Sequence, residues 1–300
     1  MKKSISIMMA AVLAAGVLAG CSGQAEETTA AETTAAETTA AETTAAETES
    51  ESAEETSAEA EETEASGEGV EILVAAAASL KNAYEEELIP MFEEQNPGVT
   101  VTGTYDSSGK LQTQIEEGLE ADVFMSAATT QMDALNEEGM IASDTITNLL
   151  ENKIVLIVPS SSELGLASFE DIAKAESIAL GDPASVPAGQ YAQEALTNLG
   201  IWDSIQDKVS FGTNVTEVLN QVAAASADAG IVYATDAASM ADQVTVIAEA
   251  PEGSLAEPVI YPVAVVANSA HPDEANAFVD FLKTDEAMAV FESYGFSAGQ

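Results

Sequence analysis

The stretch from Gly103 to Lys110, GTYDSSGK, has the residue types of a phosphate-binding loop. A P-loop has four residues between its two glycines, and a Ser or Thr that binds Mg²⁺ follows its lysine. Here five residues separate Gly103 from Gly109, and Leu111 follows the lysine. The nucleotide-binding interpretation therefore fails on spacing and on chemistry. Two serines and a glycine at the start of a helix still predict an anion site, because helix N-termini present unpaired N–H groups.

Apolar runs that alternate with amphipathic segments predict an α/β protein. We expect strands at 70–78, 99–106, 121–127, 153–159, 177–183, 229–235 and 259–269, the last interrupted by Pro262. We expect helices at 80–95, 108–118, 129–139, 188–199, 214–225 and 273–294. Such alternation indicates mainly parallel sheets covered on both faces. Ligands of these folds bind where strands end and helices begin.

The predicted strand–helix junctions are rich in small residues, hydroxyl groups and free backbone amides. Their sequences are AAASL, DSSGK, PASVPAGQY, FGTNV and YATDA. None carries a cluster of cations, and the sequence holds no Cys/His/Asp set with the spacing of a metal site. The only histidine, His271, is expected in an exposed loop. The junctions therefore predict an anion site built from neutral donors, with no metal ligand and no cofactor.

The chain is strongly acidic, with 52 Asp and Glu against 8 Lys and Arg, and it contains no arginine. This charge argues against nucleic-acid binding, which requires a basic surface. A site for a small carboxylate would ordinarily use the guanidinium fork that this chain lacks. The long-range field opposes an incoming anion, so affinity must come from short-range hydrogen bonds. Screening over about 8 Å at physiological salt makes this workable.

Residues 1–20 have the pattern of a bacterial lipoprotein signal peptide. Lysines at positions 2 and 3 precede an apolar run from Ile5 to Ala19, which is short for a transmembrane helix. The following LAGC resembles a lipobox, in which Cys21 is lipidated and becomes the N-terminus. An ordinary signal peptide with a chance cysteine is the alternative. Cys21 is the only cysteine, so no intramolecular disulfide and no cysteine-based metal site is expected.

Residues 21–69 are predicted to be a disordered acidic tether. AETTA occurs at 31–35, 36–40 and 41–45, and residues 22–69 contain 15 glutamates but no lysine. A segment with no large apolar residue cannot bury a core. As a flexible coil it would span on the order of 40 Å, and self-repulsion would extend it. An acidic tail that binds a partner is the alternative.

Five motifs after residue 70 resemble the molybdate-binding proteins of ABC transporters, in that family's order and spacing. They are AAAASLKNAYEEELIPMFEEQNPGVTVTGTYDSSGKLQTQIEEGLEADVFMSA, GDPASVPAGQYAQEAL, LGIW, GIVYATDA and YPVAVV. The resemblance implies a two-lobed type II periplasmic-binding-protein fold with two crossover segments, near Lys153 and near 252–261. Lobe 1 would comprise 70–153 and 254–300, and lobe 2 would comprise 154–253.

The resemblance also implies a ligand set, namely Ser79, Ser108, Ala188, Val215 and Tyr233. The two serines would each give a hydroxyl and a backbone N–H, the tyrosine its phenol, and the other two a backbone N–H. Lys110 falls where the family varies and is not counted. Each residue also has an ordinary structural interpretation, as a helix cap, a helix start after proline, or a packed side chain. Ser108→Ala and Tyr233→Phe should weaken binding and leave the unliganded fold nearly as stable.

Molybdate suits a site made only of donors, because at neutral pH it is an unprotonated dianion with four acceptor oxygens. Tungstate is expected as a second ligand. Phosphate would gain from a carboxylate that accepts its proton, and Asp106 and Asp182 lie near the junctions. Phosphate and sulfate therefore stay open as alternatives. An enzyme is disfavoured because no base accompanies Ser107 or Ser108, whereas a sensor or adhesin with this fold stays open.

The resemblance further implies the partners of the protein, and the lipobox with its long tether indicates the location. The expected partners are an ABC permease and its ATPase, and the membrane through lipidated Cys21. The protein is expected to be a monomer on the cell surface, anchored to the outer face of the cytoplasmic membrane.

Overall fold

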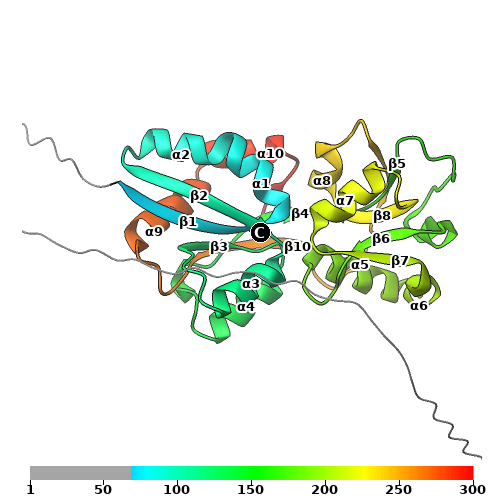
Figure 1. Ribbon diagram of the computed structural model, residues 1–300, viewed down its shortest axis with the longest axis horizontal. Helices are drawn as coiled ribbons and strands as arrows, with labels where there is room; N and C mark the ends of the chain where they lie inside the picture. The colour runs from blue at the N-terminus through cyan, green and yellow to red at the C-terminus, as the bar shows by residue number, and fades with distance from the viewer. Residues whose placement is uncertain (1–68, 300) are drawn as a thin grey trace, which may run out of the picture. The chain divides into compact units, whose positions relative to one another are not determined.

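The computed structural model describes residues 69–299 (Figure 1). The predicted signal peptide, Cys21 and the tether up to residue 68 lie outside these residues. Within 69–299, no helix combines the length and the apolar character that crossing a membrane requires.

The first sheet has six strands in the order β11-β4-β10-β3-β1-β2. These strands are β1 (Val70–Ala77), β2 (Val99–Asp106), β3 (Val123–Met125), β4 (Thr147–Asn152), β10 (Val259–Val265) and β11 (Ser297–Ala298). Strand β1 pairs in parallel with β2 and β3, whereas β10 pairs antiparallel with β3 and β4. Residues 74–77 of β1 are all buried, as an apolar run without alternation predicts for a strand covered on both faces.

The second sheet has five strands in the order β7-β6-β8-β5-β9. These are β5 (Ile154–Pro159), β6 (Ile178–Gly181), β7 (Val209–Gly212), β8 (Ala229–Tyr233) and β9 (Val244–Glu249). Strand β6 is parallel to β7 and β8, whereas β5 is antiparallel to β8 and β9. The prediction of mainly parallel sheets is therefore wrong. Both sheets are mixed because β10 and β5, the strands that enter each sheet from the other, run against their neighbours.

The chain passes between the two sheets twice (Figure 1). Strand β4 ends at Asn152 and β5 begins at Ile154, so the first crossover is centred on Lys153. The second crossover joins β9 to β10 through residues 250–258. The first lies where the resemblance implied it and the second overlaps the expected 252–261, which confirms an α/β fold with two crossover segments. We call the first sheet with its helices lobe 1 and the second sheet with its helices lobe 2.

The helices are α1 (Lys81–Ala83), α2 (Ile89–Gln95), α3 (Ser108–Glu116), α4 (Thr129–Glu137), α5 (Pro187–Asn198), α6 (Trp202–Ile205), α7 (Val215–Ala223), α8 (Ala234–Ser239), α9 (Pro272–Leu282) and α10 (Asp285–Ser293). The predicted single helix over 273–294 is wrong, since α9 ends before α10 begins. Thr284 separates the two, because its hydroxyl oxygen accepts the N–H of Ala287 at 3.2 Å and caps α10. The predicted interruption at Pro262 is a shift in register within a continuous strand β10.

Alternate residues of the central strands of lobe 1 pack on opposite faces of the sheet. Ala75 and Phe124 face α3 and α4, where they contact a cluster that includes Leu111 and Leu135. The other face holds a larger cluster from α2, α9 and α10. There Phe278 is fully buried, with its ring centroid 5.0 Å from that of Phe92.

Phe278→Ala should lower the free energy of unfolding by about 3–5 kcal/mol, because it removes a buried ring and leaves a cavity. Urea denaturation followed by circular dichroism measures this loss. Phe211, whose side chain is 47% exposed on β7, is the matched control. Phe211→Ala should cost less than about 1 kcal/mol. Equal losses in the two variants would contradict the assignment of Phe278 to the core.

Candidate functional site

A small cavity lies between the two lobes, where several helices begin. Its volume is about 10 Å³. The lining residues are Ala77, Ala78, Ser79, Asp106, Ser107, Ser108, Ala127, Val186, Pro187, Ala188, Val215 and Tyr233. All five sequence-predicted site residues are among them, brought together from both lobes.

Each of the five residues lies at the end of a strand or the start of a helix. Ser79 follows β1 in a 3₁₀ turn, Tyr233 ends β8, and the other three lie in the first turns of α3, α5 and α7. The first N–H groups of a helix have no partner within it. Among the hydrogen bonds of residues 69–299, none is donated by the backbone N–H of Ser79, Ser108, Ala188 or Val215. These four donors are therefore available to a ligand in the cavity.

The two adjacent serines at the start of α3 have different surroundings. The Ser107 hydroxyl is buried and, within the described residues, has no hydrogen-bond partner. The Ser108 hydroxyl oxygen accepts the buried N–H of Ala127 at 2.9 Å, which leaves its own proton free to donate. Sequence reasoning selected only Ser108 as a ligand residue, although the doubled serine in DSSG was a signal for both. The structure adds Ser107 as a hydroxyl that faces the cavity without a partner.

The bond from Ala127 also changes what Ser108→Ala should do to the fold. Sequence reasoning expects this substitution to leave the unliganded protein nearly as stable. In the structure it would leave a buried N–H without an acceptor, which costs about 1–3 kcal/mol. A loss of affinity in that variant would therefore mix a structural effect with a lost ligand contact.

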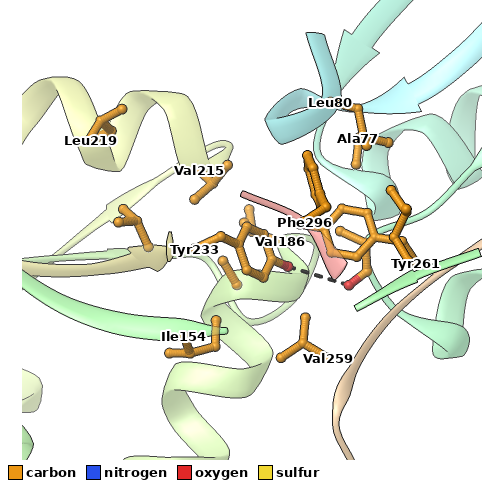
Figure 2. Close-up of a cluster of buried hydrophobic side chains, with 14 of the residues drawn as sticks. Ala77, Leu80, Ile154, Val186, Val215, Leu219, Tyr233, Val259, Tyr261 and Phe296 are labelled. Atoms are coloured by element: carbon orange, nitrogen blue, oxygen red, sulfur yellow. Dashed lines mark hydrogen bonds between the residues drawn. The ribbon is translucent and has the colours of Figure 1, made fainter. Parts of the chain in front are cut away.

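Tyr233 reaches from lobe 2 toward lobe 1 at the cavity (Figure 2). Its hydroxyl donates to the carbonyl of Ala127 at 3.5 Å, which is the long limit of a hydrogen bond, and is therefore readily redirected to a ligand. Its ring lies edge-on to that of Tyr261, with centroids 5.6 Å apart. Burial raises the pKa of both phenols well above the ordinary value, so both keep their proton at neutral pH.

Tyr261 is a supporting residue to which sequence reasoning assigned no role, although it begins the YPVAVV motif. Its hydroxyl lies 2.9 Å from the Ser79 hydroxyl and accepts the side-chain N–H of Asn152 at 3.2 Å. The same Asn152 amide donates to the Thr235 hydroxyl of lobe 2 at 3.0 Å. A Tyr261 that donates to Ser79 leaves the Ser79 proton for a ligand. Tyr261 thus fixes the position of the Ser79 hydroxyl.

Asp106 is the one carboxylate among the lining residues, and one of its two oxygens is already engaged by several donors. One of its oxygens accepts the N–H of Ser107 at 2.8 Å and the side-chain amide of Asn214 at 3.1 Å. Lys110 lies 3.3 Å from the same oxygen and forms an ion pair with it. Asp182 does not line the cavity, and one of its oxygens accepts the N–H of Ala184 at 3.0 Å.

The two lobes touch around the cavity through direct hydrogen bonds. Asp106 of lobe 1 meets Asn214 of lobe 2, and the N–H of Gly109 donates to the carbonyl of Ser185 at 3.0 Å. A Cβ on Gly109 would lie 2.5 Å from that carbonyl oxygen, so the lobes approach this closely only because residue 109 is glycine. These contacts define a closed arrangement of the lobes.

The described residues hold no group of three or more His, Cys, Asp and Glu side chains that could bind a metal ion. His271 lies in a loop before α9, as expected, but it is half-buried rather than exposed. The backbone N–H of His271 donates to the hydroxyl of Ser269 at 3.1 Å.

A cavity closed by two lobes and lined by neutral donors defines a solute-binding protein of the type II periplasmic-binding-protein fold. The chain belongs to the family described as bacterial extracellular solute-binding protein, whose family model matches residues 72–297. This confirms the fold class predicted from the resemblance. The family consists of binding proteins, which confirms that the chain is not an enzyme.

Known proteins of this family resemble the chain over most of its length. It is 42% identical over 233 residues to the ABC transporter substrate-binding lipoprotein YvgL of Bacillus subtilis (strain 168), covering 78% of this chain and 88% of that protein. It is 39% identical over 236 residues to the molybdate-binding protein ModA of Haemophilus influenzae, covering 76% and 90%. A solved substrate binding domain of a molybdenum ABC transporter from Clostridium difficile is 37% identical, with a TM-score of 0.61, covering 77% and 100%. The resemblance to molybdate-binding proteins noted in the sequence is thus confirmed.

Asp236 is a buried carboxyl group behind the cavity, in the first turn of α8. It accepts the N–H of Tyr233 at 3.2 Å, and burial raises its pKa to about 7. The pKa of an aspartate in an unfolded chain is about 3.9. Between these two values the folded protein binds more protons than the unfolded chain, so the free energy of unfolding falls as pH rises and levels off above about pH 7.

Asp236→Asn removes this titration and keeps an oxygen for the Tyr233 N–H. The stability of the variant relative to the natural protein should be greater at pH 8 than at pH 5 by about 2–3 kcal/mol. Urea denaturation at both pH values measures the difference. Asp242→Asn, at an exposed position after α8, controls for the loss of one negative charge. An equal pH effect in both variants would mean that Asp236 is not buried.

Proposed function

We propose that this protein is an extracytoplasmic solute-binding lipoprotein that captures molybdate between its two lobes and delivers it to an ABC permease and its ATPase. The observation that carries the proposal is the cavity between the lobes, where four backbone N–H groups and the Ser107 hydroxyl have no partner within the described residues. The names of its relatives support the same ligand, since the Haemophilus influenzae protein is called molybdate-binding.

The donor set meets the dianion without a buried counter-cation. Four backbone N–H groups, the hydroxyls of Ser79, Ser107 and Ser108, and the phenol of Tyr233 surround the cavity. A hydrogen bond to a charged acceptor contributes about 1.5–3 kcal/mol, so several together offset the desolvation of the anion. The N-termini of α3, α5 and α7 add the positive ends of three helix dipoles.

The state of Asp106 favours molybdate over phosphate. At neutral pH phosphate carries one or two protons, and each of these protons needs an acceptor in the site. Asp106 is the lining carboxylate, and three donors already occupy one of its oxygens while Lys110 lies 3.5 Å from the other. Molybdate has no proton to place and needs no such acceptor. We include tungstate as a second ligand of the same charge and shape, bound through the same donors.

The location and organisation of the chain belong to the same proposal. Lipidation of Cys21 in LAGC would anchor the protein to the outer face of the cytoplasmic membrane, with residues 21–69 as its tether. The family's description as extracellular and the name lipoprotein of the Bacillus subtilis relative support this location. We assign residues 70–153 and 254–300 to lobe 1 and residues 154–253 to lobe 2, supported by the membership of the two sheets. The protein would act as a monomer.

Titration calorimetry of the purified full chain with molybdate, tungstate, sulfate and phosphate, at neutral pH and moderate salt, tests the ligand. Tight one-to-one binding of molybdate and tungstate is expected, with sulfate and phosphate at least tenfold weaker. Heat from sulfate or phosphate alone would overturn the molybdate assignment and keep the site. No heat from any of the four anions would overturn oxyanion binding and favour a sensor or adhesin with this fold.

Ser107→Ala and Tyr233→Phe test the donors directly. Each should weaken molybdate binding by about ten- to hundredfold, because each removes one hydrogen bond to a charged ligand. The phenylalanine keeps the ring packing of Tyr233, and thermal unfolding of the unliganded variants checks that the fold is intact. Ser210→Ala, at an exposed position on β7, is the matched control and should not change the affinity. Unchanged affinity in both site variants would mean that the ligand binds elsewhere.

A further inference from the structure

Five of the six lysines between residues 69 and 299 have a partner for their ammonium group. Lys110, Lys153, Lys174 and Lys283 form ion pairs with acidic side chains. The ammonium of Lys208 donates to the carbonyls of Ala173 and Ala175 at 2.8 and 2.9 Å. Lys81 alone of the six has neither an ion pair nor a hydrogen bond from its ammonium within the described residues, and its side chain is exposed. Among residues 69–299, which are very acidic, Lys81 therefore carries the one free positive charge of a lysine.

Lys81 lies beside the candidate site. It is the first residue of α1 and follows Ser79 by two positions. It lines two grooves between the lobes, one of about 760 Å³ and one of about 150 Å³. Ala78 lines both grooves and also the cavity, so both grooves adjoin the cavity at that residue, three positions before Lys81. Lys81 itself is not among the residues that line the cavity.

The other charges at these grooves are already engaged. Glu217, in the larger groove, accepts the N–H and the hydroxyl of Thr213 at 2.7 and 2.8 Å, and these bonds lower its pKa. Its negative charge opposes an entering anion. Asp236, in the smaller groove, is buried behind the site. No ion pair joins Lys81 to Glu85, four residues further along the chain, so the ammonium charge stays available.

We propose that Lys81 is the capture residue of this site, an unpaired cation that draws the oxyanion into the cleft between the lobes and does not contact it once bound. This inference rests on the proposed oxyanion-binding function. Residues 70–300 carry a formal charge of −31, which repels a dianion. Exposed charges act over about one Debye length, so an anion close to the cleft responds mainly to the charges at its entrance. A favourable local charge raises the association rate and has little effect on dissociation.

Stopped-flow fluorescence of the full chain with sodium molybdate, at low and at high ionic strength, tests the inference. It compares Lys81→Gln with Lys283→Gln, a control variant of the same net charge. Lys81→Gln should lower the association rate constant about three- to tenfold near 20 mM salt and less than twofold near 500 mM. The dissociation rate constant should stay within about twofold. Lys283→Gln removes one positive charge at the end of α9, outside both grooves, and should change the association rate much less.

Equal association rates in the two variants would overturn the capture role. A loss that appears in the dissociation rate, or that persists at high salt, would also overturn it, because Lys81 would then contact the bound ligand. Molybdate binding by the natural protein distinguishes a failure of this inference from a failure of the proposed function. If it binds no molybdate, the proposed function fails; if it binds molybdate and Lys81→Gln matches Lys283→Gln, only the capture role fails.

Discussion

The structure depends on one constraint: a buried dianion must be met by hydrogen-bond donors alone, without a counter-cation in the cavity. Helix starts satisfy this constraint, because their first N–H groups have no partner within the helix. Here α3 from lobe 1 and α5 and α7 from lobe 2 begin at one cavity, and the turn that contains Ser79 adds a further N–H. The donors of either lobe alone would surround only part of an anion, so closure of the lobes completes the site.

A side-chain network connects this site to both crossover segments. Asn152 is the last residue of β4 before the first crossover, and Tyr261 lies in β10 just after the second. The Asn152 amide donates to Tyr261 and also to Thr235 of lobe 2, while Tyr261 contacts the Ser79 hydroxyl. The position of Ser79 is thus linked to the two segments that a hinge motion would bend. An amide at residue 152 suits this place, because its two N–H donors can serve both lobes at once.

The acidity of the chain and its affinity for an anion act over different distances. The formal charge of −44 sets a repulsive field over the whole chain, but salt screens that field within about 8–10 Å. Inside the cavity the nearest carboxylate, Asp106, is neutralised by Lys110 and by hydrogen bonds. In the proposed function, short-range hydrogen bonds decide binding, because the N–H and O–H groups that line the cavity outnumber its one carboxylate. The surface charge instead affects the solubility of the protein and the rate at which an anion approaches it.

The sequence by itself determined the strand–helix junctions, because strand ends and helix starts are written in local patterns. The two crossovers and the five residues that line the cavity followed from its resemblance to molybdate-binding proteins. The sequence failed where long-range contacts decide. The mixed sheets, the strands β4, β7 and β9, which were not predicted, and the break between α9 and α10 depend on pairing and packing across the fold. Only the tertiary structure decided which hydroxyl is free: Ser108 is bound by Ala127, 19 residues away, whereas its neighbour Ser107 is unpartnered. The hydrogen bond that the Asn214 amide donates to Asp106, 108 residues away, was equally invisible in the sequence, because position in space decides which groups become hydrogen-bond partners.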